Sequence, residues 1–341
     1  MANKPPYTIT EKAADYLAKI VETVTRLEYG TGFKRDIRLH RENRARTIHS
    51  SLAIEGNSLT LGEVTAVIEG KVIAGKQADI KEVKNAYEAY DKIMTFDPYA
   101  VKDFLIAHKL MTQGLVAEAG KFRSGDVGVF DGDVAVHIGA RPQFVPGLVN
   151  ELFGWAKESE LHPVLKSAIA HYEIETIHPF ADGNGRMGRL WQTLLLAKWN
   201  AIFAWIPMEE VLYRNRPQYY QAIEAARKAN DSGDFIEFTL SVVLDTIADQ
   251  EKHQVKHEDK HQVEWAEKQL EVLRSLGTTA LSRKEVFDAV GMNGDSRSFK
   301  RHMEPLLEAG LIEMTVPDRP NSRLQKYRLT ENGKTVIGES R

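Results

Sequence analysis

The chain has 341 residues, and its 45 lysines and arginines against 48 aspartates and glutamates give a formal charge of −3. This near balance excludes a polycation built as a whole for nucleic acid, and the absence of cysteine excludes disulfides and cysteine-ligated zinc. The length predicts about two domains, with room for a substantial core.

Nothing in the sequence indicates export or a membrane. The opening residues Met1-Ala2-Asn3-Lys4-Pro5-Pro6 lack an apolar signal segment. Apolar runs such as residues 201–208 are too short to span a bilayer. We therefore expect a soluble cytoplasmic protein with no membrane contact.

Apolar residues recur every three to four positions along most of the chain, which predicts a mainly α fold. Thr60 and Glu63 have the spacing of a capping box and predict a helix start. Gly56 and Asn57 suit a left-handed cap after the second predicted helix. We expect helices over residues 9–27, 42–54, 79–96, 99–113, 146–157, 164–177, 190–199 and 215–228.

One β-hairpin is predicted in the first two thirds of the chain. Residues 127–130 and 134–138 are rich in valine and flank Asp131-Gly132-Asp133, a hairpin turn signal. An isolated hairpin is marginal in water, so we expect it to lie against the helices.

The last third predicts a long helical connection and a small domain. Residues 249–267 are strongly charged, and residues 234–276 are expected to form one or two long helices that lead to a second domain. A capping box at Ser282 and Glu285, a helix over 296–308, and strands over 310–314 and 325–329 then follow the pattern of a winged helix-turn-helix.

Residues 278–341 contain 11 lysines and arginines and 9 acidic residues. The basic side chains gather on the predicted recognition helix and wing, which suits phosphate contact. The same fold also serves protein contacts, so DNA and protein both remain candidate partners. The clustered residues are Arg297, Lys300, Arg301 and His302 on the helix and Arg319, Arg323, Lys326 and Arg328 on the wing.

The densest group of chemically active residues is His178-Pro179-Phe180-Ala181-Asp182-Gly183-Asn184-Gly185-Arg186-Met187-Gly188-Arg189. It stands between two predicted helices. A loop that enters a helix N-terminus binds anions, because the first-turn N–H groups have no intrahelical partners. Gly183 and Gly185 let the backbone approach a phosphate closely.

This stretch matches the signature His-Pro-Phe-x-Asp-Gly-Asn-Gly-Arg-x-x-Arg without gaps, so the chain resembles the Fic family over about residues 40–245. Proteins of that family usually transfer AMP from ATP to a hydroxyl side chain of a target protein. The resemblance implies a Fic-fold helical bundle with a β-hairpin flap over residues 41–245. A helical segment, 1–40, would precede it, and a linker, 246–277, and the winged-helix domain, 278–341, would follow.

The residue chemistry fits the implied activity. His178 has a pKa suited to a general base for a hydroxyl nucleophile. Asp182 is a hard oxygen ligand suited to the Mg²⁺ that accompanies ATP. The backbone of residues 183–185 and the Asn184 amide can stabilise charge on the α-phosphate.

Further residues are expected around the nucleotide. Arg186 and Arg189 can hold the outer phosphates, while Phe180 is expected to anchor the binding loop in the core. The resemblance places Tyr219 and Tyr220 near adenine, with core packing as the alternative. In the family's phosphotransferase branch a lysine replaces Gly185, so glycine here favours nucleotidyl transfer.

A second resemblance lies at Ser51-Leu52-Ala53-Ile54-Glu55-Gly56, which is similar to the family's inhibitory motif Ser/Thr-x-x-x-Glu-Gly/Asn. It implies an inhibitory helix over about residues 42–56. Glu55 would pair with Arg189 and keep this arginine from the γ-phosphate. We expect Glu55→Gly to raise AMP transfer.

The hairpin resembles the family's flap, which holds a target segment by strand addition. Gly120-Lys121-Phe122-Arg123 is similar to the run that precedes it. The docking residues would be Val127, Gly128, Val129, Val134 and Val136. The alternative is a hairpin that only covers the core.

Three functions therefore compete: an autoinhibited protein adenylyltransferase that uses ATP and Mg²⁺, removal of AMP with Glu55 positioning a water, and a DNA-binding regulator with a nucleotide-sensing site. The target protein is unknown. Because relatives often pair and modify themselves, the resemblance also implies a homodimer.

Overall fold

The computed structural model describes residues 4–30, 37–131, 134–261, 267–277, 279–317, 322 and 324–338. The chain divides into two compact units, residues 1–254 and 255–341. The boundaries predicted at 40, 245 and 277 remain predictions. Over the described ranges, no helix combines the length and apolar character needed to cross a membrane.

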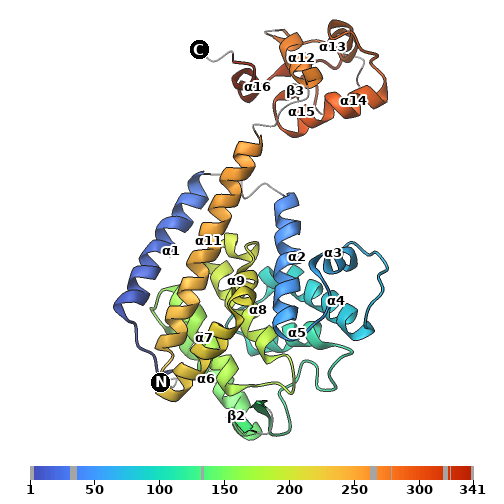
Figure 1. Ribbon diagram of the computed structural model, residues 1–341. Coiled ribbons are helices and arrows are strands. Elements are labelled where there is room, and N and C mark those ends of the chain that lie inside the picture. The colour runs from blue at the N-terminus through green and yellow to red at the C-terminus, as the bar shows by residue number, and fades with distance from the viewer. Residues whose placement is uncertain are drawn as a thin grey trace. The chain divides into compact units, whose positions relative to one another are not determined.

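The first unit is built around two packed helices, α7 (Pro163–Ile177) and α8 (Asn184–Trp199). Both are buried around most of their circumference, because neither has a continuous polar face. Trp191 of α8 stacks on Phe153 at 5.7 Å and meets Phe104 edge-on at 4.9 Å. In Figure 1, α8 lies in the interior of this unit, and α7 packs against it beside α6.

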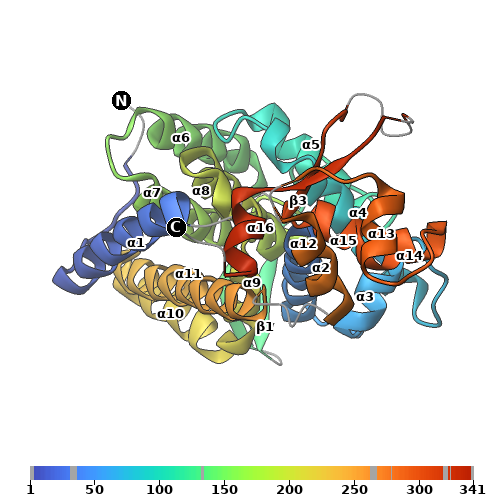
Figure 2. The same cartoon turned by 90° about the horizontal axis from the view of Figure 1, so that it is seen from above.

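The other elements of this unit surround the central pair, and both views place α1 beside α11 (Figure 2). Lys12 and Glu237 join these two helices by an ion pair of 3.2 Å. The helices are α1 (Glu11–Gly30), α2 (Ile37–Ile54), α3 (Leu61–Ile68), α4 (Gln77–Asp91), α5 (Val101–Thr112), α6 (Val145–Glu158), α9 (Met208–Arg214), α10 (Arg216–Ala229) and α11 (Gly233–His261), with short 3-10 turns at Ile93–Thr95, Pro142–Phe144 and Ala201–Ala204.

The predicted turn between α2 and α3 is confirmed in its details. Gly56 has φ +92°, a conformation that favours glycine, and its N–H donates to Ala53 O at 3.1 Å. Thr60 and Glu63 form the predicted capping box. The end of α2 is therefore fixed in place, and this end carries Glu55.

The predicted hairpin is confirmed as an antiparallel pair, β1 (Gly128–Asp131) and β2 (Val134–Ile138). Gly128 pairs with Ile138 and Asp131 with Val134, and the register shifts between Val129 and Phe130. The turn residues 132 and 133 lie outside the described residues.

The second unit has a core of its own, which includes Leu273, Phe287 and Met303. The capping box of Ser282 and Glu285 is present. The elements are α12 (Glu267–Leu276), α13 (Arg283–Ala289), α14 (Ser296–His302), α15 (Glu304–Glu308), β3 (Ile312–Met314), β4 (Tyr327–Leu329) and α16 (Glu331–Val336), with β3 and β4 antiparallel.

Two predicted helices need correction, and two helices were missed. The helix predicted over 296–308 is two helices, because Pro305 has no N–H to offer the preceding turn. The helices α9 and α16 were not predicted. The helix predicted from 190 begins six residues earlier, at Asn184.

Gly185 and Gly188 of the motif lie within α8. A Cβ at Gly188 would lie 2.7 Å from His171 Cδ2 on α7. This glycine therefore serves close packing of two helices rather than a loop. Gly185, Arg186 and Arg189 lie on the first turns of this helix.

Candidate active site

His178 occupies the junction where α7 ends. It has φ 52° and ψ 61°, a left-handed conformation that is uncommon outside glycine, and its N–H donates to Ile174 O at 3.0 Å. Its Nδ1 lies 3.4 Å from Glu175 O, which assigns the proton to Nδ1 and the basic lone pair to Nε2. This is the tautomer that a base acting through Nε2 requires.

Arg123 holds this junction in place. Its Nε donates to His178 O at 2.7 Å and its Nη1 to Gly125 O at 2.8 Å, while Nη2 donates to Ala140 O. The Arg123 N–H also donates to Pro179 O at 3.1 Å. One buried guanidinium thus joins the base of the hairpin to the backbone of the predicted catalytic residue.

The loop after His178 is closed by Asn184. Its Oδ1 accepts from Phe180 N at 2.8 Å and its Nδ2 donates to Phe180 O at 2.9 Å. The side chain is 3% exposed. In this structure both polar atoms of the Asn184 amide bond within the loop, and its expected contact with the α-phosphate stays a prediction.

Phe180 anchors the loop, as expected. It is fully buried and stacks on His108 with ring centroids 3.7 Å apart. Its side chain cannot reach a nucleotide, so its part in the predicted binding set is to hold the backbone.

His108 was missed by sequence reasoning, because its partner is 74 residues away and no local pattern marks it. Its Nδ1 accepts from Gly120 N at 3.0 Å, so Nε2 carries the proton and donates to Asp182 O, also at 3.0 Å. Burial lowers the pKa of His108 to about 4. A neutral imidazole is thus built into the floor of the loop.

The N-terminus of α8 has features that suit the anion site predicted from the motif. Gly183 has φ +87° and turns the chain into the helix. Within the described part of the chain, no side chain caps this end. The N–H groups of Asn184, Gly185 and Arg186 are the first-turn donors, and the helix dipole adds positive potential there.

Asp182 meets the requirements of a magnesium ligand that works together with phosphates. Its side chain is 62% exposed, and its Oδ1 accepts from Gly183 N at 2.6 Å. The described residues contain no cluster of three metal-binding side chains. Mg²⁺ commonly takes one or two carboxylates and completes its shell with phosphates and water, so a single carboxylate here fits the ion.

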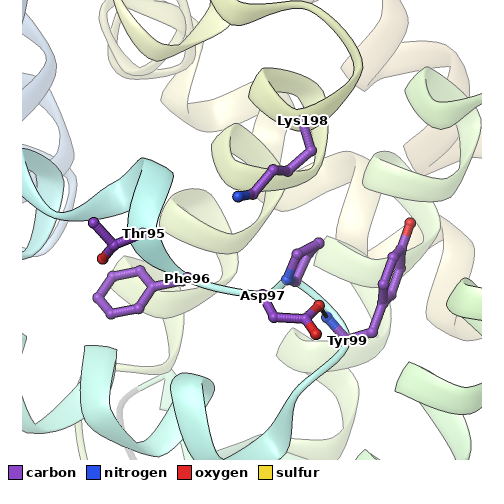
Figure 3. Close-up of a pocket in the computed structure, with 6 residues that line it drawn as sticks. Thr95, Phe96, Asp97, Tyr99 and Lys198 are labelled. Atoms are coloured by element: carbon purple, nitrogen blue, oxygen red, sulfur yellow. Dashed lines mark hydrogen bonds between the residues drawn. The ribbon is translucent and has the colours of Figure 1, made fainter.

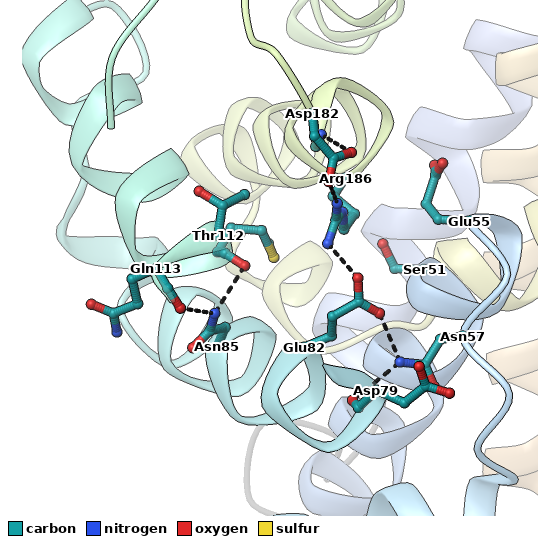
Figure 4. A network of polar contacts seen from close by, with 12 residues as sticks. Ser51, Glu55, Asn57, Asp79, Glu82, Asn85, Thr112, Gln113, Asp182 and Arg186 are labelled. Carbon is teal, nitrogen blue, oxygen red and sulfur yellow. Dashed lines mark hydrogen bonds and ion pairs between the residues drawn. The ribbon is translucent and has the colours of Figure 1, made fainter. Parts of the chain in front are cut away.

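Arg186 contacts two carboxylates of the protein, and its expected role at an outer phosphate stays a prediction. Its side chain is 4% exposed, with Nη1 2.9 Å from Glu82 Oε1 and Nη2 3.0 Å from Asp182 Oδ2 (Figure 4). Both ends of the guanidinium are occupied by carboxylates of the protein. In this state Arg186 organises Asp182 rather than presenting itself to an outer phosphate.

Arg189 is held by the last turn of α2. Its Nη2 lies 2.7 Å from Glu55 Oε1 and 2.9 Å from Ser51 O, and its Nε donates to Ser51 Oγ at 3.1 Å. Burial alone would lower the pKa of Arg189, but the charge and hydrogen bond of Glu55, together with Tyr219 and Glu175, raise the pKa on balance. The ion pair expected from the second motif is present.

Gly185 makes room for this ion pair. A Cβ at this position would collide with Glu55 Oε1 and lie 3.0 Å from Arg189 Nη1. Glycine here therefore serves the contact with α2 as well as the approach of a phosphate. Gly56, by contrast, is required by its φ of +92° and not by space.

The two tyrosines differ. Tyr219 is 2% exposed, bonds His171 Nε2 through its hydroxyl at 3.1 Å and packs on Phe235. It belongs to the core, the alternative left open above. Tyr220 is 45% exposed, and burial followed by the charge of Glu55 raises its pKa. Only Tyr220 therefore remains a candidate for contact with adenine.

The flap residues lie where the sequence predicts. Gly128, Val129, Val134 and Val136 are on β1 and β2, and Val127 O accepts from Gly139 N at 3.0 Å at the base of the hairpin. The side chains from 129 to 138 are outside the described set, so the docking role stays a prediction.

A cavity of about 370 Å³ elsewhere in this unit is unrelated to the motif. It is lined by Thr95, Phe96, Asp97, Pro98, Tyr99 and Lys198 (Figure 3). None of the predicted site residues lines it, and Lys198 Nζ donates to Met94 O at 2.9 Å. The chemistry is therefore concentrated at the end of α7 and the start of α8.

Two family models match the chain: "Fic/DOC family" over residues 98–196, and "Filamentation induced by cAMP protein Fic-like, C-terminal domain" over 268–330. The crystal structure of a Fic family protein from Desulfovibrio desulfuricans G20 is 40% identical, with a TM-score of 0.72. The match covers 96% of this chain and 99% of that one. The chain belongs to the Fic family.

Named members of the Fic family are more distant. Protein adenylyltransferase Fic of Nematostella vectensis is 31% identical over 211 residues, which are 59% of this chain and 47% of that protein. Protein adenylyltransferase fic-1 of Caenorhabditis elegans is 28% identical over 215 residues, 59% and 39% of the two chains. The chain thus spans less than half the length of these curated relatives. The Fic/DOC match contains residues 178–189 but not Glu55.

Proposed function

We propose that this chain is an autoinhibited protein adenylyltransferase, which transfers AMP from ATP to a Ser, Thr or Tyr hydroxyl of a target protein and of itself. Support comes from the names of the Fic relatives and from the chemistry at His178 and the N-terminus of α8.

In the proposed reaction the target hydroxyl attacks the α-phosphorus of ATP, and His178 Nε2 takes the hydroxyl proton. A new P–O bond forms to the target, the bond to the β-phosphate breaks, and pyrophosphate leaves. The first-turn amides of α8 face the charge that grows on the α-phosphate. Mg²⁺ bound through Asp182 would neutralise phosphate charge.

The observation that carries the autoinhibited state is the binding of Arg189 by Glu55 and Ser51. Arg189 is 1% exposed and its hydrogen bonds run to α2. A γ-phosphate would have to displace Glu55 to reach this guanidinium. The resting protein is therefore expected to show little transfer, although its base and loop are in place.

The test is incubation with α-³²P-labelled ATP, Mg²⁺ and a cell lysate. Glu55→Gly should label itself and target proteins more than wild type does. The double variant Glu55→Gly/His178→Ala should lose about 10²–10⁴-fold of that rate, the usual contribution of a general base. Equal labelling by wild type and Glu55→Gly would exclude inhibition by Glu55, and label that persists without His178 would exclude it as the base.

Removal of AMP is a second candidate, favoured by the position of Glu55. Its side chain is 34% exposed beside the N-terminus of α8, where a carboxylate can orient a water. An AMP-modified target discriminates the two activities. Wild type should release AMP faster than Glu55→Gly if the second activity operates, and neither should release AMP if Glu55 only inhibits.

For the second unit we propose duplex DNA or a protein as partner. Arg297, Lys300 and Arg301 are exposed on and around α14, which favours phosphate contact, whereas Arg319 and Arg323 of the predicted wing lie outside the described residues. Fluorescence anisotropy with a labelled DNA duplex distinguishes the two candidate partners. Binding that weakens steeply with salt supports DNA as the partner, and no binding at low salt supports a protein partner.

A further inference from the structure

Glu82 on α4 lies between the end of α2 and the Asp182–Arg186 pair. Its Oε2 accepts from Asn57 Nδ2 at 2.8 Å, and its Oε1 accepts from Arg186 Nη1 at 2.9 Å. Arg186 Nη2 then reaches Asp182 Oδ2 at 3.0 Å. Figure 4 shows these contacts as one continuous chain from the turn after α2 to the start of α8.

Each member of this chain divides its polar atoms between two partners. The Arg186 side chain is 4% exposed, so its guanidinium depends on protein carboxylates for its bonds. Glu82 is 22% exposed and Asp182 is 62% exposed. A guanidinium shared between two carboxylates moves toward one when the other weakens, because a bidentate pair is stronger than two single contacts.

We propose that Glu82 is a positioning residue that sets how firmly Arg186 holds Asp182, and that Asn57 transmits the seating of α2 to this balance. The proposal rests on the proposed nucleotide site, in which Asp182 takes the metal. It adds a second connection between α2 and the site, independent of Glu55 and Arg189.

Removing the Asn57 amide and removing the Glu82 charge should change metal binding at Asp182 in opposite directions. Without the Asn57 amide, both oxygens of Glu82 are available to Arg186, which then releases Asp182 for the metal. Without the charge of Glu82, Arg186 turns fully to Asp182 and competes with the metal. By linkage, metal bound at Asp182 should also loosen Asn57 and the end of α2.

The experiment measures binding of Mn²⁺ in the presence of ATP by electron paramagnetic resonance, with full-length protein and no transfer step. Glu55→Gly serves as parent, so that the inhibitory carboxylate does not obscure the effect. Hydrogen bonds to charged groups are among the stronger ones in proteins, so Glu82→Gln should raise the half-saturating Mn²⁺ concentration about tenfold. Asn57→Ala should lower it about threefold, since a neutral amide is the weaker partner.

Asp79→Asn is the matched control. Asp79 accepts from Ser58 N at 3.1 Å and Ser58 Oγ at 2.5 Å, so it joins the same turn to the same helix without touching Arg186. Its Mn²⁺ binding should equal that of the parent.

Opposite shifts for Glu82→Gln and Asn57→Ala support the coupling, because a merely structural role would weaken binding in both. Unchanged binding, or weakening in both, overturns it. If the loss of far-ultraviolet circular dichroism shows that Glu82→Gln is unfolded, the Asn57→Ala variant tests the proposal: tighter Mn²⁺ binding supports it, and unchanged or weaker binding overturns it. A parent that binds no Mn²⁺ with ATP would refute the proposed function itself.

Discussion

Neutralising Glu55 should destabilise the protein without nucleotide and make nucleotide more stabilising. The perturbation is Glu55→Gln, which keeps the length of the side chain and removes its charge. Arg189 is 1% exposed, and its 2.7 Å bond to Glu55 is the shortest of the contacts it makes with α2. The variant therefore keeps a neutral acceptor where a charged one stood.

The magnitude follows from these contacts. A hydrogen bond between charged partners contributes about 1.5–3 kcal/mol and a neutral one about 1. The Glu55 side chain is 34% exposed, so solvent screening reduces the difference to about 1 kcal/mol. For a unit of this size that lowers Tm by about 2–4 °C.

Differential scanning fluorimetry with and without ATP and Mg²⁺ measures both effects. A ligand at about 100 times its Kd adds about 2.7 kcal/mol, so Glu55→Gln should gain several degrees more from ATP than wild type does. Glu69→Gln is the matched control, because Glu69 pairs with Lys71 at 2.6 Å where both side chains are over half exposed. If Glu55→Gln had the same Tm as wild type without ATP, or if ATP raised the Tm of both proteins equally, the proposed inhibitory contact would be refuted.

Three further outcomes test other contacts. Gly185→Ala should loosen Glu55, because the added Cβ collides with the Glu55 carboxylate. Amide hydrogen exchange of residues 51–56 should therefore become faster. The control Gly62→Ala, whose Cβ meets nothing within 4 Å, should leave that exchange unchanged. Arg123→Lys, in the Glu55→Gly parent, should slow AMP transfer at least about tenfold by releasing His178 O, and an equal loss in the exposed control Arg141→Lys would contradict this role. Burial raises the pKa of Glu173 from 4.5 to about 7, so the stability that its proton provides is full below pH 4.5 and lost as the pH rises through 7. In urea unfolding, the free energy of unfolding of Glu173→Gln should therefore rise relative to that of wild type by up to about 3 kcal/mol between pH 4.5 and 8. A difference in unfolding free energy between the two proteins that does not vary with pH would exclude a buried carboxyl.

Sequence reasoning succeeded where a local pattern carries the information. The capping boxes and the two strands of the hairpin each occupy a few consecutive residues, so the local pattern identifies them. The contact between Glu55 and Arg189 spans 134 residues, and it was predictable because both ends belong to recognisable motifs.

The contacts of the remaining site residues could not be predicted, because these residues are distant in sequence from the motif that they support. His108, Arg123 and Glu82 act on backbone carbonyls or side chains that only the packing of α4, α5 and α7 brings near. The glycines of the motif were also misleading. They suggest a loop up to residue 189, yet they permit close contact along a helix that begins at Asn184.

The order of the contact in the chain has a consequence for protein synthesis. Glu55 precedes Arg189 by 134 residues, so α2 leaves the ribosome first. At about 5–20 residues per second the delay is roughly 7–27 s. The turn that carries Glu55 is thus already synthesised when residues 178–189 emerge. Under the proposed inhibition, a new copy would therefore pass through no interval in which the site is complete and Glu55 is absent.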